Sequence, residues 1–191
     1  GELLGDHFGW GKMSLYDAAF RTPLMIRMPG LNNAGARIDA ITESIDVTPT
    51  ILDWIGADIP NSMDGRSLLP ILQGAISDDW RSYSFSELDF GSSSDPNARQ
   101  QALGTTSSAS CFSILRDERF NLVEFAADLP PVLFDRQGMW ESENVAAKPE
   151  YAQDVMRLTR QMLRHRMRNA DHTLSLFEIT SDGPKMTKRF P

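Results

Sequence analysis

The sequence has few of the residues that would point to a disulfide-stabilised, membrane-spanning or nucleic-acid-binding protein. Its 191 residues include one cysteine, Cys111, which excludes an internal disulfide and a structural zinc cluster built on thiolates. No apolar run approaches the roughly 20 residues that a membrane span requires. Lys and Arg number 19 against 26 Asp and Glu, and the net charge of −7 disfavours binding to nucleic acid or to an anionic membrane surface. We therefore expect neither partner.

What the chain does contain is the composition of a folded protein. Hydrophobic residues make up 41% and charged residues 24%, and the length allows one sizeable core. A lone cysteine and no apolar targeting segment are typical of a reducing compartment, so we expect a bacterial-type cytoplasmic location. The chain begins with Gly1 and not with Met, from which we expect a processed or truncated polypeptide.

In the N-terminal half, local signals predict a strand between two helices. Ser14, with Asp17 three residues later, predicts a helix through residue 20. The apolar run 23–30, bounded by prolines and glycine, predicts a buried strand. A second helix is predicted over 44–56, with an acidic N-cap, a proline in the first turn and a glycine stop.

The C-terminal half is predicted to combine a small antiparallel sheet with a long helix. Segments 111–115 and 120–125 flank a charged turn and predict a hairpin, with 132–134 as a third strand. Apolar residues at helical spacing, with acidic residues first and basic residues last, predict a helix over 149–168. Segment 86–110 is so polar that we predict a long loop, of a kind that is functional, interfacial or disordered.

Two residues of the glycine-punctuated N-terminal segment are candidates for chemistry. His7 stands beside Asp6 in a loop that glycines allow to turn sharply, and such loops often present catalytic groups. Lys12 precedes the predicted helix start, where its ammonium and the positive end of the helix dipole suit an anionic substrate. The alternative for each is an ordinary exposed side chain.

Two other features are interpreted without a catalytic role. Cys111 lies on a predicted strand with no basic neighbour in the local sequence to activate the thiol, so we interpret it as a small core residue and not as a nucleophile. The five arginines between residues 157 and 168 make the last helix basic. We favour a solvated or subunit-contacting face there over a phosphate-binding face, and the acidic remainder of the chain disfavours nucleic-acid binding.

Several blocks of the sequence resemble the sulfatase branch of the alkaline phosphatase superfamily. They are Gly1–Lys12 with Phe20–Arg27, then Ser44, Asp46, Pro49–Asp53, Pro60 and Asp64–Pro70, then Arg116–Phe120 and Leu133–Asp135. Within that branch the chain is similar to the phosphonate monoester hydrolases. That likeness is carried by the helix around Trp54 and by segments 125–131 and 168–174.

The resemblance implies an α/β fold in two parts. Residues 1–74 would be the C-terminal remnant of a large alkaline-phosphatase-like α/β sandwich, and residues 75–191 a smaller α+β domain whose antiparallel sheet packs on a C-terminal helix. It also implies metal-dependent hydrolysis of phosphonate and phosphate mono- and diesters and of sulfate esters, with formylglycine as the nucleophile of the complete enzyme. The alternatives are an arylsulfatase and a non-catalytic oligomerisation or interaction module.

The family pattern also implies roles for single residues. Lys12 would contact the phosphoryl or sulfuryl oxygens, and His7 would support substrate binding from behind it. The ligands of the divalent cation (Ca, Mn or Mg) would precede Gly1, so no metal ligand is expected in this chain, and Cys111 lacks the C-x-[PS]-x-R context of formylglycine. The implied partners are a small anionic ester, the N-terminal part of the same enzyme and further copies in a homo-oligomer. We expect this chain alone to be inactive.

Overall fold

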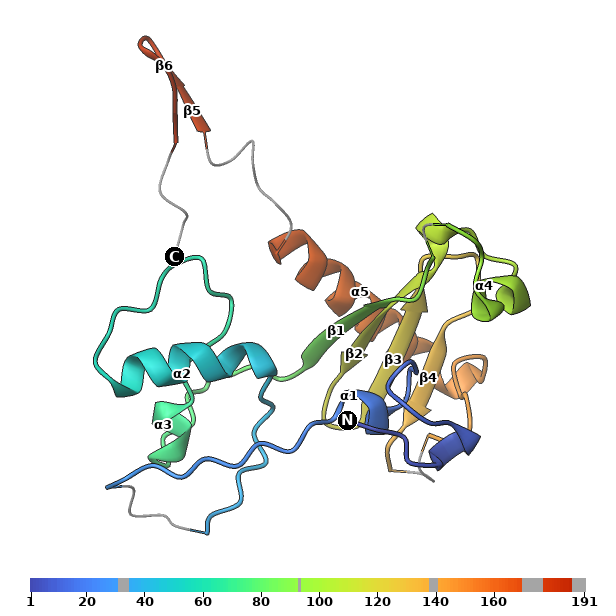
Figure 1. Ribbon diagram of the computed structural model, residues 1–191, viewed down its shortest axis with the longest axis horizontal. Coiled ribbons are helices and arrows are strands. Elements are labelled where there is room, and N and C mark those ends of the chain that lie inside the picture. Colours follow the sequence, from blue (N-terminus) through green and yellow to red (C-terminus); the bar gives the residue numbers. More distant parts are fainter. Residues whose placement is uncertain (31–34, 93, 138–140, 170–176, 187–191) are drawn as a thin grey trace. The chain divides into compact units, whose positions relative to one another are not determined.

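The computed structural model describes residues 1–30, 35–92, 94–137, 141–169 and 177–186, which belong to two compact units (Figure 1). One unit contains Gly1–Arg27 and Arg81–Leu163, and the other contains Met28–Trp80 and the chain from Arg164. Within the described ranges no helix is long and apolar enough to cross a membrane. The domain boundary expected after residue 74 concerns the whole protein and stays a prediction.

The first unit is built on a four-stranded antiparallel sheet with the strand order β1-β2-β3-β4. The strands are β1 (Ser84–Asp89), β2 (Cys111–Arg116), β3 (Phe120–Phe125) and β4 (Val132–Asp135). The predicted hairpin and third strand are confirmed. Strand β1 falls partly inside the segment predicted as a loop, because its serines weaken the local strand signal while all six of its residues pair with β2.

One face of the sheet is covered by α5 (Ala152–Asn169), which follows the 3-10 turn η4 (Pro149–Tyr151), so the predicted helix is confirmed. Leu158 and Met162 are buried against the sheet. Their neighbours in this core are Leu115, Phe120, Leu122, Leu133 and Val145. Met167, predicted on the same stripe, is 62% exposed. Five residues after Met162, at about 100° per residue, it has rotated off the buried side.

The opposite face of the sheet carries a second apolar cluster and the N-terminal segment. Leu15 and Phe20, the last residue of α1 (Asp17–Phe20), pack there. The buried members of the cluster are Phe90, Phe112, Ile114 and Val123. The helix predicted from Ser14 begins three residues late, because the Ser14 hydroxyl accepts a hydrogen bond from the Tyr16 N–H at 3.2 Å and does not cap a helix.

The predicted long loop over 86–110 is wrong for most of its length. It contains the end of β1, α4 (Ala98–Leu103) and the 3-10 helix η3 (Ser107–Ala109). Asn97 Oδ1 accepts hydrogen bonds from the Arg99 and Gln100 N–H groups, both at 3.0 Å, and Oε1 of buried Gln100 accepts one from the Asn97 N–H. Polar side chains here satisfy the backbone, and apolar content therefore underestimates the order.

The second unit contains η2 (Ser44–Asp46), α2 (Val47–Trp54) and α3 (Leu69–Leu72), which confirms the helix predicted over 44–56. Buried Asp46 accepts hydrogen bonds from the N–H groups of Glu43 and Arg66, both at 2.8 Å. Next to Arg66, a Cβ added to Gly65 would lie 2.0 Å from the Ile45 carbonyl oxygen. Only glycine fits this approach, which accounts for the Asp-Gly-Arg motif at 64–66.

Two short segments depart from expectation. Residues 23–30 form no strand, and Met25 is largely exposed. Prolines at positions 23 and 29 supply no N–H groups, and no described segment pairs with this one. Conversely, β5 (Phe177–Thr180) and β6 (Gly183–Met186) form an antiparallel hairpin that is not among the predicted elements.

Candidate functional site

Lys12 lies at the end of a closed loop formed by the first twelve residues. The Leu3 N–H donates to the Gly11 carbonyl at 3.1 Å, and the Glu2 carboxylate accepts from the Gly11 N–H. Gly11 has a φ of 85°, a conformation in which glycine is favoured. The Lys12 side chain is exposed and pairs with no carboxylate of the described residues, so its charge is available to an anion.

Backbone strain is concentrated in the same loop. Leu4, His7 and Phe8 have φ values of 49°, 50° and 59°, in the left-handed region that residues with a Cβ seldom adopt. Glu141, at 51°, completes the set of such residues in the described chain, and its carboxylate accepts a hydrogen bond from the Asp17 N–H of α1. Each costs on the order of 1–3 kcal/mol, and strain of this kind clusters at functional sites.

His7 is placed against Tyr16. The two rings are stacked, with centroids 3.5 Å apart and planes 3° from parallel, and Tyr16 in turn contacts Phe134 of β4 at 5.8 Å between centroids. No described side chain forms a hydrogen bond with the His7 ring. The structure therefore brings His7 together with an aromatic neighbour.

The start of α1 is held by residues that sequence reasoning did not single out as part of a site. Asp17 forms an ion pair with Arg116 of β2, and its N–H donates to Glu141 Oε2 at 2.6 Å. Burial lowers the pKa of the Arg116 guanidinium, and the Asp17 carboxylate opposes this shift. Glu141 Oε1 also accepts from Asn121 Nδ2 at 2.6 Å. Only Arg116 carries a sequence signal, because it opens a block that resembles the family pattern.

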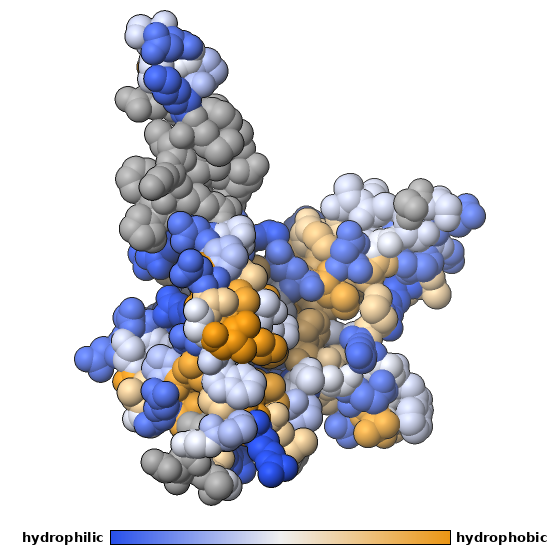
Figure 2. Space-filling model, turned by 60° about the vertical axis from the view of Figure 1, so that its left-hand side comes forward, coloured by the Kyte–Doolittle hydropathy of each residue, from blue (hydrophilic) through white to orange (hydrophobic). Residues whose placement is uncertain are grey.

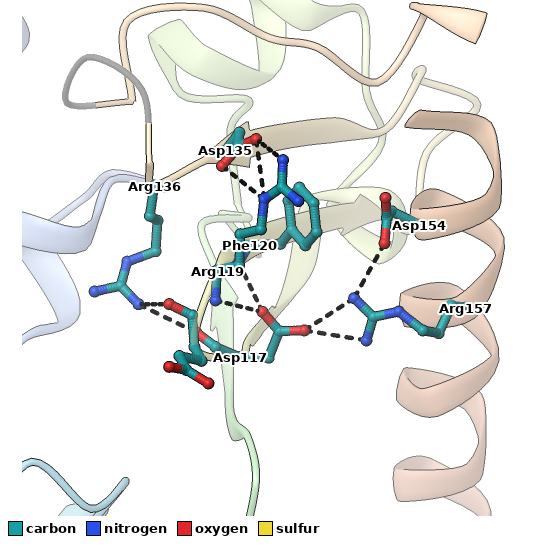
Figure 3. Close-up of polar contacts among 8 residues, drawn as sticks. Asp117, Arg119, Phe120, Asp135, Arg136, Asp154 and Arg157 are labelled. Carbon is teal, nitrogen blue, oxygen red and sulfur yellow. Dashed lines mark hydrogen bonds and ion pairs between the residues drawn. The ribbon is translucent and has the colours of Figure 1, made fainter. Parts of the chain in front are cut away.

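A second charged cluster joins the sheet to α5 (Figure 3). Arg157 pairs with Asp117 at 3.0 Å, Arg119 pairs with Asp135 at 2.6 Å, and Arg136 Nη1 donates to the Asp117 carbonyl at 3.1 Å. The hydrogen bond from the Arg119 guanidinium lowers the pKa of Asp135. Since these charges neutralise one another, the cluster fastens a helix and is not interpreted as a ligand site.

The described residues offer no alternative centre for ester chemistry. A cavity of about 350 Å³ is lined by Asp135, Glu141 and Glu143, whose carboxylates repel an anion, and Lys148 there pairs with Glu143 at 2.7 Å. Cys111 is a free, half-buried residue of β2. In the part of the chain that the structure describes, no three His, Cys, Asp or Glu side chains are grouped to hold a metal ion.

The chain matches a family model and is similar to several known proteins. The family model described as N-sulphoglucosamine sulphohydrolase, C-terminal, matches residues 5–168. The chain is similar to the phosphonate monoester hydrolase of Silicibacter pomeroyi, with 59% identity and a TM-score of 0.88, over 100% of this chain and 38% of that one. The chain is also similar to the phosphonate monoester hydrolase of Agrobacterium radiobacter, with 35% identity and a TM-score of 0.84. That match covers 98% of this chain and 37% of the other.

A curated relative extends the comparison. The multifunctional alkaline phosphatase superfamily protein PehA of Trinickia caryophylli is 38% identical over 186 residues, which is 96% of this chain and 36% of that protein. The chain thus spans little more than a third of the length of the proteins that it matches.

Proposed function

The chain belongs to the N-sulphoglucosamine sulphohydrolase C-terminal family, within the sulfatase branch of the alkaline phosphatase superfamily, and from this premise we propose that it acts in the hydrolysis of phosphonate and phosphate mono- and diesters. Sulfate esters would be alternative substrates. The chain would supply the C-terminal part of the hydrolase. The observation that carries the proposal is the strained loop that presents an unpaired Lys12 in a chain similar to two phosphonate monoester hydrolases.

Lys12 would act on the charge of the substrate. In ester hydrolysis a nucleophile attacks phosphorus or sulfur, the bond to the alcohol oxygen breaks, and negative charge grows on the surrounding oxygens. An ammonium group with three donors, held by a loop that closes on itself, can stabilise that charge as it develops. His7, stacked on Tyr16, would support the loop from behind.

The described residues of this chain do not fit the metal centre and the nucleophile that the family implies. No group of ligands is found in the described part of the chain, and Cys111 lies within a β-strand. We propose that the ligands of a divalent cation (Ca, Mn or Mg) and the nucleophile lie in the rest of the polypeptide.

The proposed partner is the N-terminal part of the same enzyme. The side chains of Ile51 and Trp54 on α2, and of Ile55 directly after it, are exposed by half or more, and Figure 2 shows apolar side chains on the face that it turns forward. An exposed apolar surface of this kind marks an interaction site. Because this chain covers only 38% of the phosphonate monoester hydrolase that it matches in full, the rest of the polypeptide is the proposed occupant. We further propose a cytoplasmic homo-oligomer, which the single cysteine and the basic face of α5 support.

The experiment that tests this function uses the protein as expressed from its natural gene. An aryl phosphonate monoester, a phosphodiester and an aryl sulfate are assayed side by side with added Mn²⁺, Ca²⁺ or Mg²⁺. The proposal predicts turnover of the phosphonate ester at least as efficient as that of the sulfate. A clear preference for the sulfate would indicate an arylsulfatase. Hydrolysis of none of the three, with stable self-association in light scattering, would favour the interaction module.

A further inference from the structure

Three side chains form a row across the sheet, on the face that carries the N-terminal segment. In the strand register, Arg116 of β2 pairs with Asn121 of β3, and Asn121 pairs with Phe134 of β4. Residues paired in this way point to the same face of a sheet. Figure 1 shows α1 and the N-terminal segment beside these strands.

Each member of the row reaches the segment that follows Lys12. Arg116 forms the ion pair with Asp17, and Phe134 contacts the ring of Tyr16. Asn121 acts through Glu141, whose two carboxylate oxygens accept one hydrogen bond from Asn121 Nδ2 and one from the Asp17 N–H. Side chains from three strands therefore hold two consecutive residues, Tyr16 and Asp17, in place.

Two features of this arrangement oppose stability. Asn121 is almost fully buried, yet its Oδ1 accepts no hydrogen bond from the described residues. Glu141 holds its carboxylate in place from a left-handed backbone conformation. A buried polar atom without a partner and a strained backbone both cost free energy that a simple apolar contact would not. A role in positioning other residues accounts for the presence of both the unpaired Asn121 oxygen and the strained Glu141 backbone.

Hydrogen bonds along a short stretch of chain connect Tyr16 to Lys12. The Lys12 carbonyl accepts a hydrogen bond from the Ser14 N–H at 2.8 Å, and the Ser14 hydroxyl accepts one from the Tyr16 N–H at 3.2 Å. Tyr16 also stacks on His7, within the loop that Lys12 ends. The middle of the loop and its Lys12 end are thus tied to the residues that the sheet holds.

We propose that Arg116, Asn121 and Glu141 are positioning residues, which set the place of the Lys12 ammonium by fixing Tyr16 and Asp17 on the sheet. This inference rests on the ester hydrolase function proposed above. In this proposal the antiparallel sheet contributes to catalysis by positioning Lys12, without contacting the substrate.

The test compares Arg116→Met with a matched control, Arg119→Met, in the protein expressed from its natural gene. Both arginines lie at the β2–β3 turn and pair with an aspartate, but Arg119 pairs with Asp135 and not with the N-terminal segment. With an aryl phosphonate monoester, Arg116→Met lowers kcat by at least about tenfold while KM changes little, since a displacement of about 1 Å costs roughly a hundredfold. Arg116→Lys, which keeps the ion pair, restores most of the rate.

A second readout does not depend on activity. Hydrogen exchange of the amides in residues 1–16 becomes faster in Arg116→Met and stays at the wild-type rate in Arg119→Met. Equal effects of the two variants on kcat and on exchange, or no effect of Arg116→Met on exchange, would overturn the proposal. If Arg116→Met does not fold, Glu141→Gln replaces it, because the amide retains the size but loses one of the two acceptors. An inactive wild-type protein would sink the proposed function, while exchange would still decide on positioning.

Discussion

The backbone N–H of Asp17 donates a hydrogen bond of 2.6 Å to Glu141 Oε2 across 124 residues of sequence. The carboxylate that accepts it comes from a residue with a φ of 51°, and the donor lies five residues after Lys12. This contact joins the start of α1, shortly after the loop that carries the candidate cation, to the segment after β4. The candidate site is therefore a product of both ends of the first unit.

The first prediction concerns Lys12 itself. In the protein expressed from its natural gene, Lys12→Met lowers kcat/KM for a phosphonate ester by about 10²–10³, the usual effect of removing one charge-stabilising donor. Steady-state kinetics measure it. Lys148→Met is the matched control, because Lys148 pairs with Glu143 at the surface and lies outside the Lys12 loop. A normal rate in Lys12→Met would remove Lys12 from the site.

The second prediction concerns the 191-residue chain by itself. We expect no hydrolysis of an aryl phosphonate monoester and no rise in Tm on adding Mn²⁺, Ca²⁺ or Mg²⁺, because the described residues form no cluster of metal ligands. Product release and thermal unfolding, each with and without the cation, provide the measurements. Metal-dependent turnover by the purified chain would contradict the assignment of the ligands to the rest of the enzyme.

The third prediction concerns the joint between α5 and the sheet. Leu158 is fully buried, whereas Leu163 on the same helix is 57% exposed. Leu158→Ala is expected to lower the free energy of unfolding by about 2–5 kcal/mol through lost burial and a cavity. Leu163→Ala should change it by less than about 0.5 kcal/mol. Urea unfolding followed by circular dichroism compares the two, and equal losses would mean that the helix packs differently.

The fourth prediction concerns the pH dependence of stability. The Arg119 guanidinium holds the pKa of Asp135 below its ordinary value of 3.8, so the charged carboxylate stabilises the folded state. This contribution is fully present above pH about 4 and is lost as the pH falls through the lower pKa of the folded protein. The difference in unfolding free energy between wild type and Asp135→Asn should therefore shrink below pH about 4. A difference that grows on acidification would reverse the sign of the argument.

Much of the secondary structure was accessible from local patterns. The strands from Cys111 to Asp135 and the helix from Ala152 follow alternation and helical spacing, because their burial is periodic. The helical structure within 86–110 could not be predicted in this way, since it depends on hydrogen bonds between the backbone and polar side chains such as Asn97 and Gln100. The strand expected over 23–30 failed because an apolar run forms a strand only where another segment pairs with it.

The candidate site shows the same division. By itself the sequence determined the family resemblance, the glycine-rich loop and Lys12 as a candidate cation, since these are written in consecutive residues. Only the tertiary structure decided that His7 stacks on Tyr16 and that Arg116, Asn121 and Glu141 converge on one short segment. The physical reason is that strand register and a left-handed turn bring together residues far apart along the chain, and no local pattern of residue types encodes that meeting.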